Sequence, residues 1–470
     1  MNILVLEAST SAAKAMVYNT NDDTSHIETI EYPTDGSWGQ QQDAQSVYEY
    51  LTALSKKITE GIHIDIIALI TTWHSLLLCD RTMQTQSPVY IWSYPDAAEL
   101  CRNMRKDRVW ADDFYARTGC QVNASFPYFK LAYLRDCDID ISENLIADQG
   151  SYLNAKLTGV FGTTQCMASG SGLVNVKTGE YDEELLQQLH IEKQQLPQIF
   201  PSDTAFPLCS VAAQEMGLAA GIPVLLAYSD GGANQVGAGA LRQGIMTLSI
   251  GTSGAMRMHV AAPKSDKNEG LWCYRSPKGL LAGAATSGAC NCINWARETL
   301  FPENTDYAYM EQNGTERDIP GFMPFLFGER APGWNDLRTG GFFHLKPEHT
   351  LQDKYQAVQE GVLYNLYQCY ERMCAVYGKP EEIRLSGGIL HSEKWTQMCA
   401  DVFGREITVV EDMHSSMMGG AVMAMEKIGI FTDAECYQPK ICKICRPDPV
   451  MQQKYQKRYL RYLRCYSTQN

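Results

Sequence analysis

The sequence predicts an α/β protein built from two related halves. At 470 residues the chain is too long for one ordinary hydrophobic core, so two or more domains are expected. Strand-like and helix-like segments alternate along it, which favours sheets covered by helices. Two segments, 3–18 and 245–256, each read as a strand, a Thr-Ser turn and a second strand. Each half is therefore predicted to open with a hairpin, although two unrelated hairpins could share so short a pattern.

Short apolar runs and helical spacing place the other elements of the first half. Its strands are predicted at residues 3–6, 66–71, 76–79 and 223–227, and its helices at 97–105 and 151–157.

The second half is predicted in the same way. Its elements are a helix over 351–374, a strand at 383–385, helices at 393–403 and 416–425, and a surface helix rich in Tyr, Arg and Lys over 450–466. No low-complexity linker separates the halves, which favours a tight hinge near residues 240–246. We therefore expect a first domain over residues 1–243 and a second over 244–470.

The composition excludes several classes of protein. Hydrophobic residues make up 45% and charged residues 20%, as in soluble globular chains, and no apolar run is long enough to cross a bilayer. The first residues lack the basic region of a signal peptide, so a cytoplasmic location is expected. A net charge of −14 argues against binding to nucleic acid or to an anionic membrane. It does not argue against a small anionic ligand, which backbone N–H groups and a metal ion can hold. The oligomeric state stays open, with a homodimer as one option.

Sixteen cysteines are scattered along this large chain, which favours reduced thiols over a disulfide framework. Cys442 and Cys445 form a single CxxC pair. A structural zinc site needs a second pair of ligands at suitable spacing, so ordinary thiols are the expected state of both.

Asp230 is the leading candidate for a catalytic carboxylate. It follows the apolar strand 223–227 and stands in a turn with Ser229, Gly231 and Gly232. Phosphoryl transfer to an alcohol needs a group that accepts the hydroxyl proton, and an Asp serves this role in kinases of other folds. The alternative is that Asp230 merely caps the helix that follows, a role for which Asp is well suited.

Two glycine-rich segments could hold a nucleotide. In the segment Gly251, Thr252, Ser253 and Gly254, glycine lets the backbone approach an anion and the hydroxyls add donors. An ordinary hairpin turn also favours these residues. The loop of Ser386, Gly387 and Gly388 suits contact with a base or ribose, or a tight connection between strand and helix. Neither the 251–254 segment nor the run Gly237, Ala238 and Gly239 fits a Walker A motif or a Rossmann fingerprint.

Trp73 and His74 follow a predicted strand, and they suit stacking against a polyol and hydrogen bonding to it. A His beside apolar residues is, however, often structural. The same caution applies to Trp92 and Lys130, because aromatic residues mostly fill cores and lysines mostly coat surfaces.

Taken in order, these motifs resemble the FGGY family of carbohydrate kinases over nearly the whole chain. The matching segments are 6–11 (first phosphate hairpin), 72–76 (sugar contact), 168–173, 229–231 (catalytic Asp), 251–254 (second phosphate hairpin), 386–388 with 400–404 (adenosine side) and the glycines Gly419 and Gly420. The resemblance implies two actin/hexokinase-like (ribonuclease H-like) ATPase domains around a central cleft, with ATP, Mg²⁺ and a small sugar as ligands.

The resemblance also implies roles for individual residues. Asp230 would accept the proton of the sugar hydroxyl. Glu7, through water, and Asp230 would orient Mg²⁺. The remaining residues fall into three groups: Thr10, Ser11, Gly251, Thr252 and Ser253 on phosphate, Ser386, Gly387 and Gly388 on adenosine, and Trp73, His74, Lys130 and Asp230 on the sugar.

Within the family, the segments 250–257 and 328–335, and the segment 118–120 followed by Pro127 and Lys130, are most similar to gluconate kinases, and xylulose kinases come next. The implied reaction is the conversion of D-gluconate and ATP to 6-phosphogluconate. The chain departs from the family pattern at Glu7, Ser9, Asp96, Thr339 and His344, where the family usually has Asp, Gly, Arg, Arg and Gly. These departures motivate a second hypothesis, a non-catalytic sugar or nucleotide sensor. A third, a dehydrogenase, rests on glycines alone and lacks the fingerprint.

Overall fold

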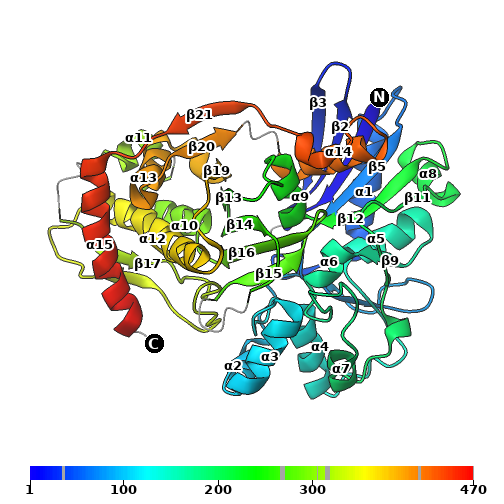
Figure 1. Ribbon diagram of the computed structural model, residues 1–470, viewed down its shortest axis with the longest axis horizontal. Coiled ribbons are helices and arrows are strands. Elements are labelled where there is room, and N and C mark those ends of the chain that lie inside the picture. The colour runs from blue at the N-terminus through cyan, green and yellow to red at the C-terminus, as the bar shows by residue number, and fades with distance from the viewer. Residues whose placement is uncertain (34–37, 265–269, 304, 313–317, 411–413, 469–470) are drawn as a thin grey trace.

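Two mixed β-sheets, each with helices around it, form the molecule (Figure 1). The computed structural model describes residues 1–470 except 34–37, 265–269, 304, 313–317, 411–413 and 469–470. The first sheet has six strands in the order β11 (Ala205–Pro207), β12 (Pro223–Ser229), β5 (Ile66–Thr71), β1 (Asn2–Ala8), β2 (Ala12–Asn19) and β3 (Thr24–Glu31).

The second sheet has seven strands. Their order is β15 (Trp272–Arg275), β16 (Leu280–Thr286), β14 (Gly254–Val260), β13 (Ile245–Ile250), β19 (Glu382–Ser386), β20 (Ile407–Val410) and β21 (Ile441–Cys445).

The two sheets share one topology over five strands. The order β3-β2-β1-β5-β12 in the first corresponds to β16-β14-β13-β19-β20 in the second. In both, the first two pairings are antiparallel and the last two are parallel. The two predicted hairpins are β1–β2 and β13–β14, so their Thr-Ser turns occupy equivalent places in the two halves.

The described part of the first half contains nine α-helices. They are α1 (Ala44–Ile58), α2 (Ala98–Met104), α3 (Arg108–Thr118), α4 (Pro127–Asp136), α5 (Gln149–Thr158), α6 (Gln165–Ser169), α7 (Glu183–Gln188), α8 (Ser210–Met216) and α9 (Asp230–Gly237). The predicted helices at 97–105 and 151–157 correspond to α2 and α5.

The second half contains α10 (Cys290–Leu300), α11 (Tyr307–Met310), α12 (Leu351–Tyr377), α13 (Glu393–Phe403), α14 (Ser415–Lys427) and α15 (Pro449–Thr468). The long helix α12 begins at a capping box, in which Thr350 and Asp353 bond to each other's backbone N–H groups. The four helices predicted here are all present.

Small two-stranded sheets complete the fold. They pair β4 (Gln41–Gln42) with β7 (Val89–Tyr90), β6 (Leu77–Cys79) with β8 (Leu145–Ala147), β9 (Gly162–Thr164) with β10 (Gln198–Phe200), and β17 (Gly321–Met323) with β18 (Gly341–Phe343). The strand predicted at 76–79 is thus β6, which lies outside the main sheet.

Helices α9 and α14 cross in direct backbone contact between the two halves. A Cβ atom on Gly237 would lie 1.9 Å from the carbonyl oxygen of Ser415, and one on Gly419 would lie 1.9 Å from that of Ala233. Only glycine permits this approach. Although α14 comes late in the chain, its buried side chains share a core cluster with the first sheet, including Ile3, Val5 and Ile70.

The C-terminal helix α15 has one buried face, which the prediction of a surface helix did not include. The face consists of Tyr455, Tyr459, Tyr462 and Tyr466. Tyr459 and Tyr462 each lie 5.7 Å, between ring centroids, from Tyr364 of α12. Spaced three or four residues apart, these tyrosines fall on one side of the helix.

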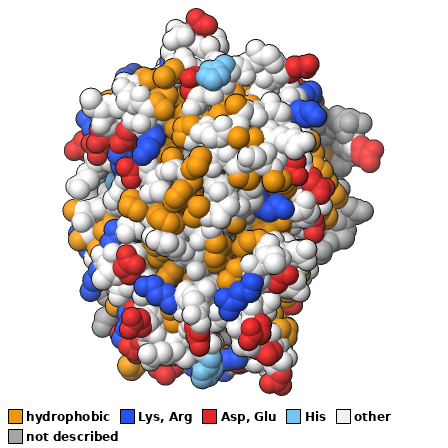
Figure 2. Space-filling model, turned by 90° about the vertical axis from the view of Figure 1, so that its right-hand side faces the viewer, with side chains coloured by type: hydrophobic (Ala, Val, Ile, Leu, Met, Phe, Trp, Pro, Cys, Tyr) orange, Lys and Arg blue, Asp and Glu red, His pale blue; other side chains and the backbone are white. Residues whose placement is uncertain are grey.

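All sixteen cysteines are free thiols. None of the helices in the described part of the chain has both the length and the apolar character needed to cross a membrane. On the face of the first half that Figure 2 shows, acidic and basic side chains are intermingled around a hydrophobic and uncharged middle.

Candidate active site

A cleft between the two sheets brings most of the candidate residues together. Its cavity volume is about 340 Å³, which lies within the range of small-molecule sites. The first half contributes Thr10, Ser11, Trp73, His74, Trp92 and Asp230, and the second contributes Ser249, Gly251, Thr252, Ser253, Ala255, Arg257, Trp272, Tyr274, Ala285 and Arg330.

Asp230 is the first residue of α9, and it is not the cap of that helix. The capping residue is Ser229, whose hydroxyl accepts a hydrogen bond from the backbone N–H of Gly232 at 3.0 Å. The carboxylate of Asp230 accepts from the N–H of Gly231 at 2.7 Å and from that of Trp73 at 3.4 Å. Because Ser229 takes the capping role, the carboxylate of Asp230 is left to line the cleft.

The surroundings of Asp230 raise its pKa. Burial is the main cause, and the nearby charge of Glu7 acts in the same direction. The guanidinium of Arg257 and the N–H of Gly231 act against it by favouring the ionised form. A carboxyl group with a raised pKa is a better proton acceptor than an ordinary Asp.

The two Thr-Ser turns reach the cleft from opposite halves, and other groups occupy their carbonyl oxygens. The carbonyl of Gly251 accepts from the N–H of Cys290 at 2.8 Å, and that of Thr252 accepts from the N–H of Asn291 at 3.2 Å. In the first turn, the amide of Gln42 donates to the carbonyl of Thr10 at 2.9 Å. Such turns can offer hydroxyl and N–H donors to phosphate oxygens.

Aromatic side chains line the opposite part of the cleft. Trp272 and Tyr274 are stacked with ring centroids 4.3 Å apart, and Trp73 meets Tyr274 edge-on at 5.2 Å. The indole N–H of Trp73 donates to the carbonyl of Cys166 at 2.8 Å, which fixes the orientation of the ring. A wall of this kind suits the C–H faces of a sugar.

His74 is held in one tautomer. Its Nδ1 lies 2.6 Å from the carbonyl oxygen of Gly170, which can only accept, so Nδ1 carries the proton. Burial, with a smaller contribution from Arg330, lowers the pKa of His74 to about 3. The ring is therefore neutral at pH 7, and its Nε2 is an acceptor for a hydroxyl group.

Sequence reasoning assigned no role to Arg257 and Arg330, although both lie in the cleft. Arg257 is on β14, and Arg330 lies 5.5 Å from the ring centroid of Trp92 and 5.9 Å from that of Trp334. Both arginines fall inside segments, 250–257 and 328–335, that resemble gluconate kinases. That resemblance was the available signal, but it did not indicate which residues reach the cleft.

Comparison with known proteins shows the family to which the chain is related. Residues 2–237 match the N-terminal domain and residues 246–427 the C-terminal domain of the FGGY family of carbohydrate kinases. The chain belongs to this family. It is 26% identical to a gluconokinase of Bacillus subtilis (strain 168), over 95% of this chain and 92% of that one.

Solved structures of FGGY kinases share the whole fold. A gluconate kinase and a ligand-bound xylulose kinase, both from Lactobacillus acidophilus, each have a TM-score of 0.92 and 27% identity, covering 99% of this chain and 98% of theirs. The two-domain, actin/hexokinase-like fold is therefore confirmed, and the activity is that of a carbohydrate kinase. The gluconate kinase and the xylulose kinase are equally similar to this chain in sequence identity and in TM-score.

Lys130, which the FGGY resemblance placed on the sugar, lies outside the set of residues that line the cleft. Its ammonium group donates to the carbonyls of His74 at 2.5 Å, Ser125 at 2.8 Å and Tyr90 at 3.3 Å. These bonds use all three of its hydrogens. Lys130 thus holds the backbone beside His74, and burial lowers its pKa.

Ser386, Gly387 and Gly388 lie behind the second turn. A Cβ atom on Gly387, whose φ is +94°, would lie 2.6 Å from the carbonyl oxygen of Ile250, and one on Gly388 would lie 3.0 Å from Sγ of Cys290. The loop therefore adjoins the 251–253 turn, although it does not itself line the cleft.

Glu7 is buried at the end of β1, and both of its oxygens are engaged. Oε2 pairs with Lys14 at 3.2 Å, and Oε1 accepts from the hydroxyl of Ser416 at 2.5 Å. Among the described residues, no group of three or more His, Cys, Asp or Glu side chains could by itself hold a metal ion. Two carboxylates near the cleft, Glu7 and Asp230, fit Mg²⁺, which is usually bound through one or two carboxylates, waters and substrate phosphates.

Asp96 and Thr339 depart from the family pattern, and both are exposed. The carboxylate of Asp96 accepts from the hydroxyl of Tyr94 at 2.5 Å and does not line the cleft. The positive charge in the cleft comes instead from Arg257 and Arg330 of the second half.

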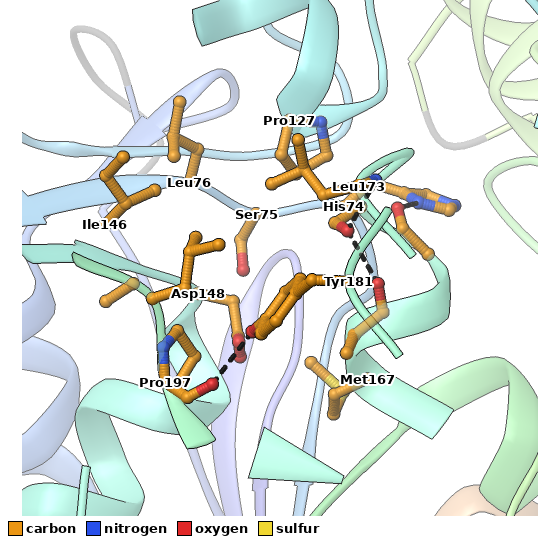
Figure 3. Close-up of a pocket in the computed structure, with 15 residues that line it drawn as sticks. His74, Ser75, Leu76, Pro127, Ile146, Asp148, Met167, Leu173, Tyr181 and Pro197 are labelled. Atoms are coloured by element: carbon orange, nitrogen blue, oxygen red, sulfur yellow. Dashed lines mark hydrogen bonds between the residues drawn. The ribbon is translucent and has the colours of Figure 1, made fainter. Parts of the chain in front are cut away.

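A second pocket lies next to His74, inside the first half (Figure 3). The hydroxyl of Tyr181 lies close to the carboxylate of Asp148 and donates to the carbonyl of Pro197 at 2.9 Å. The cavity volume of about 30 Å³ accommodates a water molecule or two but no sugar. The larger cleft is therefore the candidate active site.

Proposed function

We propose that this chain transfers the γ-phosphoryl group of ATP to a terminal hydroxyl of a sugar acid, with D-gluconate as the substrate and 6-phosphogluconate as the product. The observation that carries this proposal is that Asp230 lies in one cleft with both Thr-Ser turns. Its carboxylate stands at the start of α9 but does not cap that helix, because Ser229 does. Phosphoryl transfer requires a proton acceptor and groups that donate hydrogen bonds to the phosphate oxygens, and the cleft offers one acceptor and two such sets of donors.

In this mechanism, the carboxylate of Asp230 accepts the proton of the sugar hydroxyl as the hydroxyl oxygen attacks the γ-phosphorus. The bond from the γ-phosphorus to the bridging oxygen breaks, and ADP leaves. Thr10, Ser11, Gly251, Thr252 and Ser253 hold phosphate oxygens. Glu7, through water, and Asp230 would hold Mg²⁺, which would supply neutralisation of the phosphate charge. Closure of the cleft excludes water, which would otherwise compete as the nucleophile.

The division of labour follows the two halves. We assign the sugar to the domain over residues 1–243, where Trp73 and His74 form a wall of the cleft. We assign the nucleotide to the domain over 244–470, with Ser386, Gly387 and Gly388 on the adenosine side. Gluconate is supported by the similarity to gluconokinases and by the two arginines in the cleft.

The test has two parts. The purified protein is assayed for ATP consumption with gluconate, xylulose, ribulose and glycerol, and gluconate is expected to have the highest kcat/KM. Asp230→Asn is expected to lower kcat by about 10²–10⁴-fold while ATP binding and folding are retained.

Each outcome separates one hypothesis from another. A higher kcat/KM with xylulose than with gluconate would identify xylulose as the substrate. Turnover with none of these sugars, together with measurable ATP binding, would favour the sensor hypothesis. Near-normal turnover in Asp230→Asn would remove Asp230 from the mechanism.

A further inference from the structure

Two arginines in the cleft have guanidinium nitrogens that no other described residue satisfies. Nε and Nη1 of Arg257 and Nε of Arg330 are buried and have no hydrogen-bond partner among the residues that the structure describes. A buried cationic donor without a partner is costly to the folded state. The arrangement therefore indicates that these donors are kept for a ligand.

Other buried arginines of the chain show what a structural role looks like. Arg338 pairs with Glu329 at 2.7 Å through Nη1, and this ion pair compensates a buried Nε that itself makes no hydrogen bond among the described residues. Arg384 pairs with Glu382 at 2.9 Å and also donates to the carbonyl of Ala238 at 2.6 Å. Each of these arginines has a carboxylate in contact, whereas no ion pair within the described residues joins Arg257 or Arg330 to one.

The charges of the cleft do not balance. Among the described residues that line it, Asp230 is the one carboxylate facing the two guanidinium groups of Arg257 and Arg330. His74 is neutral at pH 7 and adds no charge. One positive charge is left over in a chain whose net charge is −14, so the lining itself favours an anionic substrate.

The positions of the two arginines suit a planar anion. A Cβ atom on Gly231 would lie 3.1 Å from Nε of Arg257, so this guanidinium passes over the start of α9 beside Asp230. Arg330 is held against the indole rings of Trp92 and Trp334. A guanidinium held by its face keeps its N–H edge for a partner, and that edge matches the two oxygens of a carboxylate.

We propose that Arg257 and Arg330 together form the site that recognises the substrate's carboxylate, so that the cleft selects sugar acids over neutral sugars. This inference rests on the proposed function and adds the residues that determine its specificity. The terminal hydroxyl of the same molecule lies at Asp230. The side chain of Asp96, where related kinases have Arg, plays no part in this recognition.

The decisive experiment compares gluconate with gluconamide, which has the same hydroxyl groups but a neutral amide in place of the carboxylate. In the wild-type protein, kcat/KM is expected to be at least about 100-fold higher for gluconate. In Arg257→Gln and Arg330→Gln, this ratio is expected to fall by at least about 10-fold, mainly through loss of gluconate turnover. Arg446→Gln, a change in an exposed ion pair, is the matched control and leaves the ratio unchanged.

Other results would overturn the inference. An equal loss of turnover for gluconate and gluconamide would assign the arginines to the transferred phosphate or to Asp230. Equal kcat/KM of the wild-type protein for gluconate and gluconamide would contradict the proposed carboxylate site. Should a Gln variant fail to fold, Arg257→Lys is the replacement, because it keeps the charge but not the paired donor edge.

The same experiment distinguishes failure of this inference from failure of the proposed function. Xylonate and galactonate are assayed beside xylulose and glycerol. Preference for another sugar acid would support the arginine site and contradict gluconate as the substrate. Preference for a neutral sugar would support kinase activity and contradict the arginine site. Calorimetric titration with gluconate and gluconamide measures the same discrimination without turnover, and equal affinities would also overturn the site.

Discussion

The hydroxyl of Ser416 donates a hydrogen bond to the carboxylate of Glu7 at 2.5 Å, joining α14 to β1 across 409 positions of sequence. Lys14 of β2 holds the other carboxylate oxygen at 3.2 Å. Glu7 is thus fixed from both sides at the edge of the cleft. The family usually has the shorter Asp here, and these two contacts orient the longer side chain.

Glu7→Gln is expected to weaken the use of Mg²⁺. The substitution keeps the size of the side chain but removes its charge, and loss of one outer-shell carboxylate typically lowers metal affinity by about 10–100-fold. Initial rates measured against free Mg²⁺ at constant ATP give the half-saturating concentration. Ser416→Ala, which removes only a neutral donor, is the control with a smaller effect. An unchanged Mg²⁺ dependence in Glu7→Gln would exclude Glu7 from the metal site.

The pH profile of kcat/KM is expected to have an acid limb set by Asp230. Only the ionised carboxylate can accept a proton, so activity is lost as pH falls through a pKa that burial raises above 3.8. Arg257 lowers this pKa, so Arg257→Gln should move the acid limb to higher pH. Rates are measured across the acid range with Arg446→Gln as control. A limb that stays in place would show that Arg257 does not act on Asp230.

Adding a methyl group at the crossing of α9 and α14 is expected to destabilise the protein. In Gly237→Ala or Gly419→Ala, the new Cβ would meet a carbonyl oxygen at 1.9 Å, so the helices must move apart, at a cost of about 1–3 kcal/mol. Denaturant unfolding measures the change. Gly39→Ala, where no atom lies within 4 Å of the added Cβ, is the control. Equal stability of all three variants would contradict the close crossing.

The buried pair of Glu329 and Arg338 is expected to be needed for stability. Glu329 also accepts from the hydroxyl of Tyr466 on α15 at 2.5 Å. Glu329→Gln leaves Arg338 without its counter-charge, and breaking a buried pair typically costs about 3–5 kcal/mol. Glu406→Gln breaks the exposed pair with Arg446 and should cost about 1 kcal/mol or less. Denaturation midpoints of the two variants are compared, and similar shifts would contradict the prediction.

Much of the fold could be predicted from local patterns. Apolar runs that end at turn residues are strands because both faces of a central sheet are buried, and this logic located β1, β5, β12 and β13. The repeated Thr-Ser turns indicated two related halves because each turn follows such a strand and precedes another. The buried face of α15 could also have been found, because its tyrosines recur at helical spacing.

The contents of the cleft were harder to predict, because they depend on contacts between distant segments. By sequence, Asp230 suits either a helix cap or a proton acceptor, and only the structure shows that Ser229 takes the cap. By sequence, Lys130 suits a sugar contact, but three carbonyl oxygens surround its ammonium group. Arg257 and Arg330 come from segments far apart in the chain, and only the folded structure shows that both line one cavity with guanidinium nitrogens that make no hydrogen bond to the described residues.

The positive lining of the cleft inside an acidic chain has a kinetic consequence. ATP and a sugar acid are both anions, so at long range they are repelled by a molecule with a net charge of −14 and attracted only at the cleft itself. Added salt screens the distant repulsion more than the short-range attraction, since the Debye length is about 10 Å at 0.1 M ionic strength. Association of the anionic substrates should therefore become faster as moderate salt is added, the reverse of ordinary electrostatic steering.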